Sequence, residues 1–385
     1  MTQGDTMCLG IPNKGNNILD SEEGPCEDDL DMAGWIQRKS GKGEIDRAGV
    51  ALVPWWIASN AERPEKWGDY VSAVFNWRAC HALPLNVFQK TLRVRASKVD
   101  PNAIVAQRLK RFASVMNKLA REQDMKLSQM QDLGGCRAIV SNISAVYQIY
   151  DMYLAANNKK ETEVSIKCKD YINEPKPDGY RGIHIVGRYH PRIKDRQIWD
   201  GQRIEIQLRT KLQHAFATAV ETVTTFTRHP LKFGGGPDDW KRFFSLMGSA
   251  LALRENTPVV PGTPEQKEEL ISELRQNARN LRIRPRLRGW SDALRTLPRQ
   301  NTEEGFKWLL LVLNTRENTI QVTGYTDKAK ASDLLEKLEL SEDTDLDPVL
   351  VYVPSINDLR TAYPNYYADT REFLKALRTA LKREK

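Results

Sequence analysis

CKDYINEPKPDGYRGIHIVGRY, residues 168–189, is the stretch around which this chain is organised. Strand-like residues lead into a Pro-Lys-Pro-Asp-Gly turn, and a second strand with alternating apolar positions follows it. The turn places cations beside Tyr180, and Gly179 predicts a close approach of the backbone to a ligand. Cations bind phosphate and a tyrosine ring stacks on bases, so the loop indicates either a nucleotide site or a solvated basic hairpin.

The composition is that of a soluble globular protein of two or three domains. Its 385 residues are 40% hydrophobic and 28% charged, and a net charge of +8 favours a polyanionic partner without proving one. The five cysteines are scattered without a CxxC pair, which argues against a disulfide framework and a cysteine zinc site. No apolar run reaches the roughly 18 residues of a membrane span. From the cysteine pattern and this lack of a span, we expect a reduced, cytoplasmic protein.

The pattern along the chain predicts an α+β fold, with a mixed β-sheet flanked by helices and a small C-terminal α+β domain. Residues 1–45 are rich in Gly, Asn and acidic residues and are expected to be partly disordered. The main domain is placed at 46–230, a linker with connecting helices at 231–300, and the C-terminal domain, of order ββαβα, at 301–385. Residues 48–91 look helical, and 101–131 is interpreted as one basic helix with Ile104, Leu109 and Phe112 on its buried face.

Two further strands carry charged side chains. QDLGGCRAIV (131–140) is a Gly-Gly turn that feeds an apolar strand, with Asp132 before it and Arg137 within it. A charge at such a place is typical of a metal or phosphate contact, or of a turn cap. GQRIEIQLRT (201–210) alternates, so Glu205, Gln207 and Arg209 share one face and predict a site there.

Four motifs in order resemble the synthetase domain of the RelA/SpoT family: RLKRFASVMNKL, QMQDLGGCRAIV, KDYINEPKPDGYRGIH and IEIQLRTKLQHAFATAVE. The resemblance covers about residues 75–225, and no hydrolase-type His-Asp motif precedes it. It implies a pyrophosphokinase that moves the β,γ-pyrophosphate of ATP to a ribose 3′-hydroxyl with Mg²⁺. Such a transfer needs positioning and cationic stabilisation rather than a covalent nucleophile.

The resemblance also assigns roles to residues. Asp132 and Glu205 would be catalytic and hold Mg²⁺. Arg181-Gly182 stands where the long enzymes usually carry Gln-Ser, which leaves the acceptor open and makes Arg181 the first place to look for its identity. Arg108 and Arg137 would sandwich the adenine of ATP, Lys110, Ser114 and Lys118 would bind its phosphates, and Lys169, Lys176, Tyr180, His184, Gln207 and Arg209 would surround the acceptor, with Tyr180 stacking on its base.

Two classes of acceptor exist in this family, guanine or adenine nucleotides and the 3′-CCA end of tRNA. The basic surplus favours tRNA, because phosphate contacts add affinity. Tyr363 and Tyr366 form a YxxY motif that resembles fused toxin–antitoxin proteins of the CapRel type. This resemblance implies an autoinhibited, translation-blocking anti-phage toxin whose C-terminal domain is an intramolecular partner, released by a phage capsid protein. The alternatives are a (p)ppGpp or (p)ppApp alarmone synthetase, or an inactive nucleotide- or RNA-binding regulator.

Overall fold

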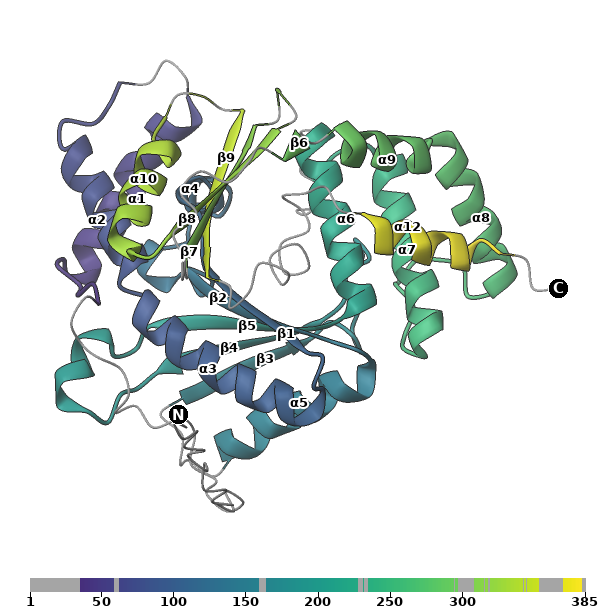
Figure 1. Cartoon of the computed structure of the whole chain (residues 1–385), viewed down its shortest axis with the longest axis horizontal. Coiled ribbons are helices and arrows are strands. Elements are labelled where there is room, and N and C mark those ends of the chain that lie inside the picture. The colour runs from purple at the N-terminus through teal and green to yellow at the C-terminus, as the bar shows by residue number, and fades with distance from the viewer. Residues whose placement is uncertain are drawn as a thin grey trace, which may run out of the picture.

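The computed structural model shows how the predicted elements are arranged (Figure 1). Tyr363, Tyr366 and most of the N-terminal segment lie outside the residues that the structure describes. The described residues are 35–58, 62–158, 164–227, 231, 235–293, 295–296, 308–314, 316–317, 319–341, 343, 345–352 and 370–382.

One nine-stranded sheet, in the order β3-β4-β5-β2-β1-β9-β7-β8-β6, runs through the molecule. Strands β2 and β5 are parallel, and the other neighbouring pairs are antiparallel except for β6 and β8. The predicted mixed sheet is therefore confirmed. The strands are β1 (Ile104–Leu109), β2 (Gly134–Val140), β3 (Val164–Asp170), β4 (Ile183–Tyr189), β5 (Arg203–Thr210), β6 (Arg295–Thr296), β7 (Trp308–Asn314), β8 (Thr319–Tyr325) and β9 (Leu346–Tyr352).

The first five strands bury one face and leave the other polar, as alternation along a strand requires. Ile204, Ile206 and Leu208 of β5 are fully buried. Helices α3 (Ala82–Val99) and α5 (Ile143–Asn158) cover this apolar face, below the sheet in Figure 1. The opposite face of the sheet is the one that carries the predicted site residues.

The helical prediction for 101–131 is wrong in its first part. Residues 104–109 form strand β1, and only Phe112–Arg121 form a helix, α4. The tertiary environment overrides the local pattern, because β1 completes its backbone hydrogen bonds with β2 along its whole length. Helices α1 (Lys42–Ile57) and α2 (Trp67–Ala79) confirm the helices predicted before Thr91, and α1 packs against both α2 and α4.

Within the region predicted as a linker with connecting helices, residues 235–293 form a packed helical unit. They contain α7 (Asp238–Glu255), α8 (Lys267–Asn280) and α9 (Ile283–Ala293), which join α6 (Lys211–Thr227) in a second hydrophobic core. The last helix, α12 (Arg371–Ala380), also belongs to this core, through Phe373 and Leu377. It was predicted to complete the C-terminal domain, but its apolar stripe fits α6 and α7 instead.

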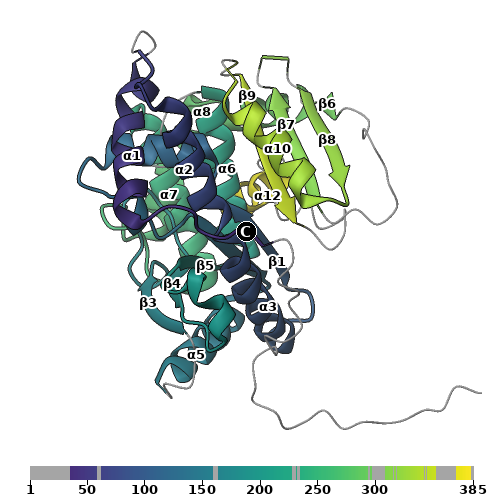
Figure 2. The ribbon, with the colours of Figure 1, turned by 90° about the vertical axis from the view of Figure 1, so that its left-hand side faces the viewer.

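Among the described residues, the C-terminal α+β unit consists of β7, β8, α10 (Lys328–Glu339) and β9 (Figure 2). Helix α10 packs against all three strands. The apolar residues of one sheet face, such as Leu311 and Val349, form a third buried cluster that includes Ala106 of β1. The unit extends the main sheet, because β9 pairs with β1 at Gln107 and Tyr352.

Buried charges fasten this unit to the main domain. Arg78 of α2 donates to Glu339 of α10 at 2.6 Å, and the amide of Phe112 donates to the other oxygen of Glu339 at 2.8 Å. Arg111 forms an ion pair with Asp347. Both ends of the segment 107–112 are thus held by the C-terminal unit.

Other sequence predictions can be checked within the same residues. His81 is a buried structural histidine, since its Nδ1 lies 2.7 Å from the carbonyl of Trp77 and burial lowers its pKa to about 4. Cys80, Cys136 and Cys168 are unpaired, while Cys8 and Cys26 lie outside the described residues. Among the described helices, none has the length and apolarity to cross a membrane.

Candidate active site

The sheet register gathers the predicted side chains on one face. Partners in register point to the same side of a sheet, so one row runs through Lys169, His184, Gln207 and Arg137 on four strands. The neighbouring row joins Glu205 of β5 and Arg108 of β1 through Gly135. Side chains that are up to 100 residues apart in the sequence therefore meet on one polar face.

One side of this face is an ion triad. Lys110 donates to one oxygen of Asp132 at 2.8 Å, and Lys118 donates to the other at 3.0 Å. The amide of Lys110 also donates to the carbonyl of Leu133 at 2.7 Å, which fixes the two segments side by side. Burial alone would raise the pKa of Asp132, but the two ammonium groups outweigh it and lower the pKa to about 2. Asp132 is therefore a carboxylate at neutral pH.

The other predicted ATP-binding residues lie on α4 and on the polar face of β1 and β2. Ser114 and Lys118 are one turn apart on α4 and half-buried. Arg108 and Arg137 lie on the polar face of adjacent strands, two residues out of register, and both are half-buried. The structure thus places on this side of the sheet the four cations and the one hydroxyl that were predicted to bind ATP. It does not test their roles.

The other side of the face is a closed ring of hydrogen bonds. His184 Nδ1 lies 2.9 Å from Glu205, and His184 Nε2 lies 2.5 Å from the hydroxyl of Tyr180. Gln207 donates to the second oxygen of Glu205 at 2.7 Å and accepts from Arg209 at 2.7 Å. Arg209 closes the ring by donating to the Tyr180 hydroxyl at 2.9 Å. Each of the five side chains in this circuit therefore contacts the next one.

The ring keeps Glu205 ionised beside a second carboxylate. Burial and the charge of Asp132 raise the pKa of Glu205, but the hydrogen bond and charge of His184 outweigh them, so its pKa lies below the ordinary value. Asp132 and Glu205 are therefore close enough to act on each other. Two ionised carboxylates suit Mg²⁺ that takes its remaining ligands from phosphate and water. Within the described residues, no cluster of three or more potential ligands offers an all-protein metal site.

The loop places its aromatic and cationic residues above the ring. Lys176 Nζ lies 4.4 Å from the centre of the Tyr171 ring and 5.3 Å from that of Tyr180. The guanidinium of Arg209 lies 5.1 Å from the centre of the Tyr180 ring. Both cations therefore lie near the aromatic ring of Tyr180, which was predicted to stack on a base. Lys169 is exposed on the edge strand β3.

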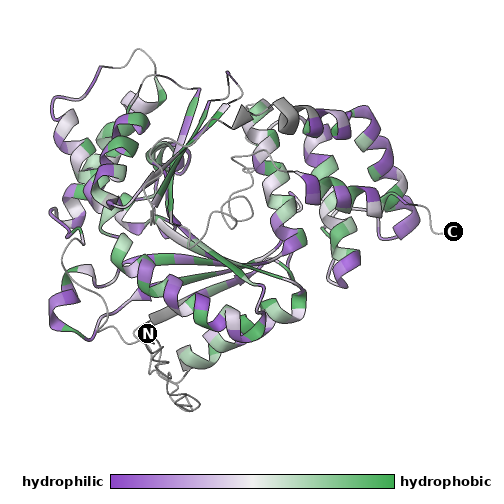
Figure 3. Ribbon diagram, viewed as in Figure 1, coloured by the Kyte–Doolittle hydropathy of each residue, from purple (hydrophilic) through white to green (hydrophobic). Residues whose placement is uncertain are grey.

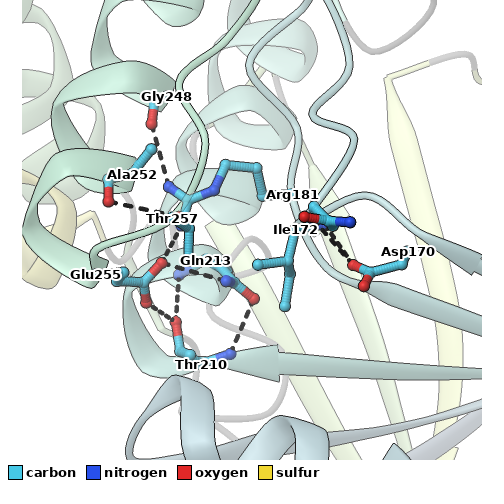
Figure 4. A network of polar contacts seen from close by, with 10 residues as sticks. Asp170, Ile172, Arg181, Thr210, Gln213, Gly248, Ala252, Glu255 and Thr257 are labelled. Atoms are coloured by element: carbon cyan, nitrogen blue, oxygen red, sulfur yellow. Dashed lines mark hydrogen bonds and ion pairs between the residues drawn. The ribbon is translucent and has the colours of Figure 1, made fainter.

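Arg181 does not belong to the polar face, contrary to its predicted link with the acceptor. Its guanidinium is buried, pairs with Glu255 and donates to the carbonyl of Gly248 on α7 at 3.1 Å (Figure 4). Glu255 also accepts from Thr210 and Gln213, so this carboxylate joins the loop before β4 to β5, α6 and α7. Arg181 is a structural anchor, because a buried guanidinium needs a buried carboxylate.

The glycines of the loop serve packing rather than a ligand. Gly179 has φ of 87°, and a Cβ there would lie 2.4 Å from the carbonyl oxygen of Phe244. Gly248 faces it, with a Cβ position 2.7 Å from Gly179. Gly182 has φ of 151° and lies against Arg209 and the Tyr180 hydroxyl. The predicted close approach is therefore real, but it is made to α7.

Sequence reasoning missed residues that position the site. Asp170 accepts from the amides of Ile172 and Asn173 and from the hydroxyl of Tyr147, which closes the start of the loop. An aspartate directly before a turn is a sequence signal for such a contact. Glu255, 74 residues beyond Arg181, left no comparable signal.

A comparison with known proteins agrees with this geometry. Residues 107–228 match the model of a region found in RelA / SpoT proteins, and this range includes the triad and the ring. Residues 107–228 of this chain are therefore similar to that region. The predicted family resemblance is confirmed for this region, and the match to CapRel-type fusions stays a prediction.

Individual relatives match about a third of the chain. The GTP pyrophosphokinase YwaC of Bacillus subtilis (strain 168) is 34% identical over 117 residues, which are 29% of this chain and 52% of that protein. The GTP pyrophosphokinase YjbM of the same organism is 32% identical over 125 residues, 31% of this chain and 54% of that protein. The chain spans about half the length of these two relatives. The crystal structure of small alarmone synthetase 1 from Bacillus subtilis, bound to its product pppGpp, matches with a TM-score of 0.38 and 22% identity, over 47% of this chain and 93% of that one.

Proposed function

We propose that this protein is an ATP-dependent pyrophosphokinase that transfers the β,γ-pyrophosphate of ATP to the ribose 3′-hydroxyl of a guanine nucleotide. The observation that carries the proposal is the division of one polar face into a cationic side and a hydrogen-bonded ring, with Asp132 and Glu205 between them. Relatives named GTP pyrophosphokinases support a guanine acceptor. This favours the alarmone-synthetase alternative over the tRNA acceptor that the basic surplus suggested.

The cationic side suits the donor. Arg108 and Arg137 can bracket a flat base, since guanidinium groups stack on rings. Lys110 and Lys118 are held by Asp132, and a polyphosphate can draw these ammonium groups toward its own charge. Asp132 and Glu205 would hold Mg²⁺, which would supply charge stabilisation for the transferred group.

The ring suits the acceptor. The acceptor's 3′-oxygen attacks the β-phosphorus of ATP, the bond from that phosphorus to the α,β-bridging oxygen breaks, and AMP leaves with this oxygen. The hydroxyl proton passes to Glu205, which is ionised and fixed by His184 and Gln207. A base that stacks on Tyr180 would meet Lys176 and Arg209, which both lie near the aromatic ring.

The reaction can be tested with labelled ATP. Purified protein is incubated with γ-labelled ATP, Mg²⁺ and GDP, GTP, ATP or bulk tRNA, and products are separated by chromatography. We expect labelled guanosine tetra- or pentaphosphate with equimolar AMP. Labelled tRNA without nucleotide product would contradict the guanine acceptor and select the tRNA reaction. Tight ATP binding without any transfer, in both the wild type and the Glu339 variant described below, would select the inactive regulator.

We further propose that the C-terminal unit regulates this reaction as an intramolecular partner. It holds the segment 107–112, which contains Arg108 and Lys110, at both ends. Arg108, Arg111 and Glu339 also line a cavity of about 740 Å³ between the two units. A change in docking would therefore move donor-binding side chains directly.

Glu339→Ala tests this regulation, because it leaves Arg78 buried without its partner and loosens the docking by about 3–5 kcal/mol. We expect transfer activity to change at least several-fold. Glu317→Ala, an exposed carboxylate in the same unit, is the matched control. Equal activity in the wild type and both variants would contradict regulation through this contact.

The finer sequence predictions remain open proposals. They are the tRNA 3′-CCA acceptor, the anti-phage toxin role, release by a phage capsid protein, autoinhibition by Tyr363 and Tyr366, and a cytoplasmic location. The tRNA arm of the transfer assay addresses the first of them.

A further inference from the structure

Six arginines lie within 14 residues of helices α8 and α9, and no acidic residue interrupts them. They were not part of any motif that predicted the active site. In Figure 1 helix α6 stands between α8–α9 and the polar sheet face, so this is a separate surface. The arginine surface consists of Arg275, Arg279, Arg282, Arg284, Arg286 and Arg288.

The arginine surface is exposed on a firmly packed base. Leu274, Ile283 and Leu287 anchor the helix pair in the second hydrophobic core. All six arginines except the half-buried Arg275 are exposed, and the two helices are largely hydrophilic on this side (Figure 3). In the part of the chain that the structure describes, no acidic side chain pairs with Arg279, Arg282 or Arg284.

Helix stability does not explain this concentration of charge. Arg275 and Arg279 lie near the C-terminal end of α8, where cations favour the helix dipole. Arg282, Arg284 and Arg286 instead flank the first turn of α9, where the dipole disfavours them. Arg282 also adopts a left-handed conformation with φ of 51°. Cations placed where they oppose the dipole indicate a use other than folding.

The arginines surround a groove and continue beyond it. Arg275, Arg279, Arg282 and Arg284 line a groove of about 460 Å³ that ends at Leu381, after α12. Arg286 lies outside the groove, 5.9 Å from the ring of Trp240, and Arg288 follows it on α9. A single nucleotide would need the groove alone, whereas a phosphate backbone can contact the whole surface.

We infer that the arginine surface binds the phosphate backbone of RNA. Guanidinium groups pair with phosphate in a bidentate manner and also stack on the unpaired bases that folded RNA exposes. Each phosphate contact releases counterions, so affinity must fall steeply with salt. The inference stands on this surface alone and does not depend on the proposed transfer reaction.

The test is binding of fluorescently labelled bulk tRNA to the full chain at a series of salt concentrations. The variant Arg279→Glu/Arg282→Glu/Arg284→Glu should bind at least about 10-fold more weakly at low salt. The slope of log affinity against log salt should shrink by about 2, the value for three lost phosphate contacts. Its melting temperature should stay equal or rise, since two of the new glutamates lie at the start of α9.

The matched control reverses three exposed lysines elsewhere, Lys98, Lys330 and Lys337, and lowers the net charge equally. We expect it to change tRNA affinity less than about threefold. Equal losses in both triple variants would overturn the inference, because net charge alone would then explain binding. Equal affinity for a duplex DNA, or complete displacement of tRNA from the surface by micromolar GTP, would also overturn it. A neutral Arg→Gln triple keeps the test valid if the charge reversal misfolds.

Discussion

The two sides of the polar face are held together by different forces. The Lys110–Asp132–Lys118 triad is ionic and lies among half-buried side chains. The ring of Tyr180, His184, Glu205, Gln207 and Arg209 is a closed circuit of hydrogen bonds, with aromatic and cationic neighbours over it. The two lysines of the ionic triad can exchange the carboxylate for another anion. The closed circuit of hydrogen bonds instead keeps its geometry when a neutral hydroxyl binds beside it.

The largest expected effect comes from Asp132→Ala, which breaks the ionic side. Transfer activity should fall at least about 10²–10³-fold, because one organising charge for the donor is lost. Steady-state product formation from labelled ATP measures it. Asp200→Ala removes an exposed carboxylate that contacts His190 and should leave activity unchanged. Full activity in Asp132→Ala would refute its assigned role.

Arg181→Gln asks whether the acceptor side depends on its anchor in α7. The variant leaves Glu255 buried without its guanidinium, so the free energy of unfolding should fall by about 3 kcal/mol. The ratio of GDP to GTP use should not change, because the side chain points away from the ring. Chemical denaturation and product ratios are the measurements. Arg188→Gln, at an exposed site on β4, the strand that follows Arg181, is the control, and an altered acceptor ratio with normal stability would contradict the anchor role.

The ionic side should also leave a mark on the pH dependence of stability. The pKa of Asp132 falls from 3.8 to about 2 on folding, so its ion pairs contribute about 2 kcal/mol above pH 4. This contribution is lost progressively as the pH falls from about 4 to 2. The difference in unfolding free energy between wild type and Asp132→Asn should therefore shrink over this range. A constant difference from pH 6 to pH 3 would show that the triad is not ionic.

The smallest effect is expected from Tyr180→Phe, which opens the ring at one atom. The loss leaves Arg209 and His184 each without one partner and should cost about 1–2 kcal/mol of unfolding free energy. The affinity for the acceptor should fall only a few-fold, since the aromatic ring remains. Chemical denaturation measures the loss of unfolding free energy, and the KM for GDP reports the change on the acceptor side. Tyr171→Phe in the same loop is the control. An equal loss of stability in this variant would mean that the hydrogen-bonded circuit contributes no particular stability.

Much of the site could be predicted from the sequence, because strands repeat every two residues. Glu205, Gln207 and Arg209 share a face by alternation alone, and the structure confirms it. The resemblance to the family motifs, rather than strand alternation, identified Asp132 and His184 as site residues. Residues 104–109 were misassigned, because a short apolar run fits a helix or a strand and only its pairing with β2 decides between them.

The sequence by itself determined the resemblance to a RelA/SpoT region, the mixed sheet and the residues of its polar face, since periodicity and motif spacing are local properties. Only the tertiary structure decided that Arg181 and Gly179 face α7, that α12 joins the helical core, and that the C-terminal strands extend the main sheet through β9. These outcomes depend on contacts between residues far apart in the chain. No local pattern encodes them, because burial and charge pairing are settled only when distant segments meet.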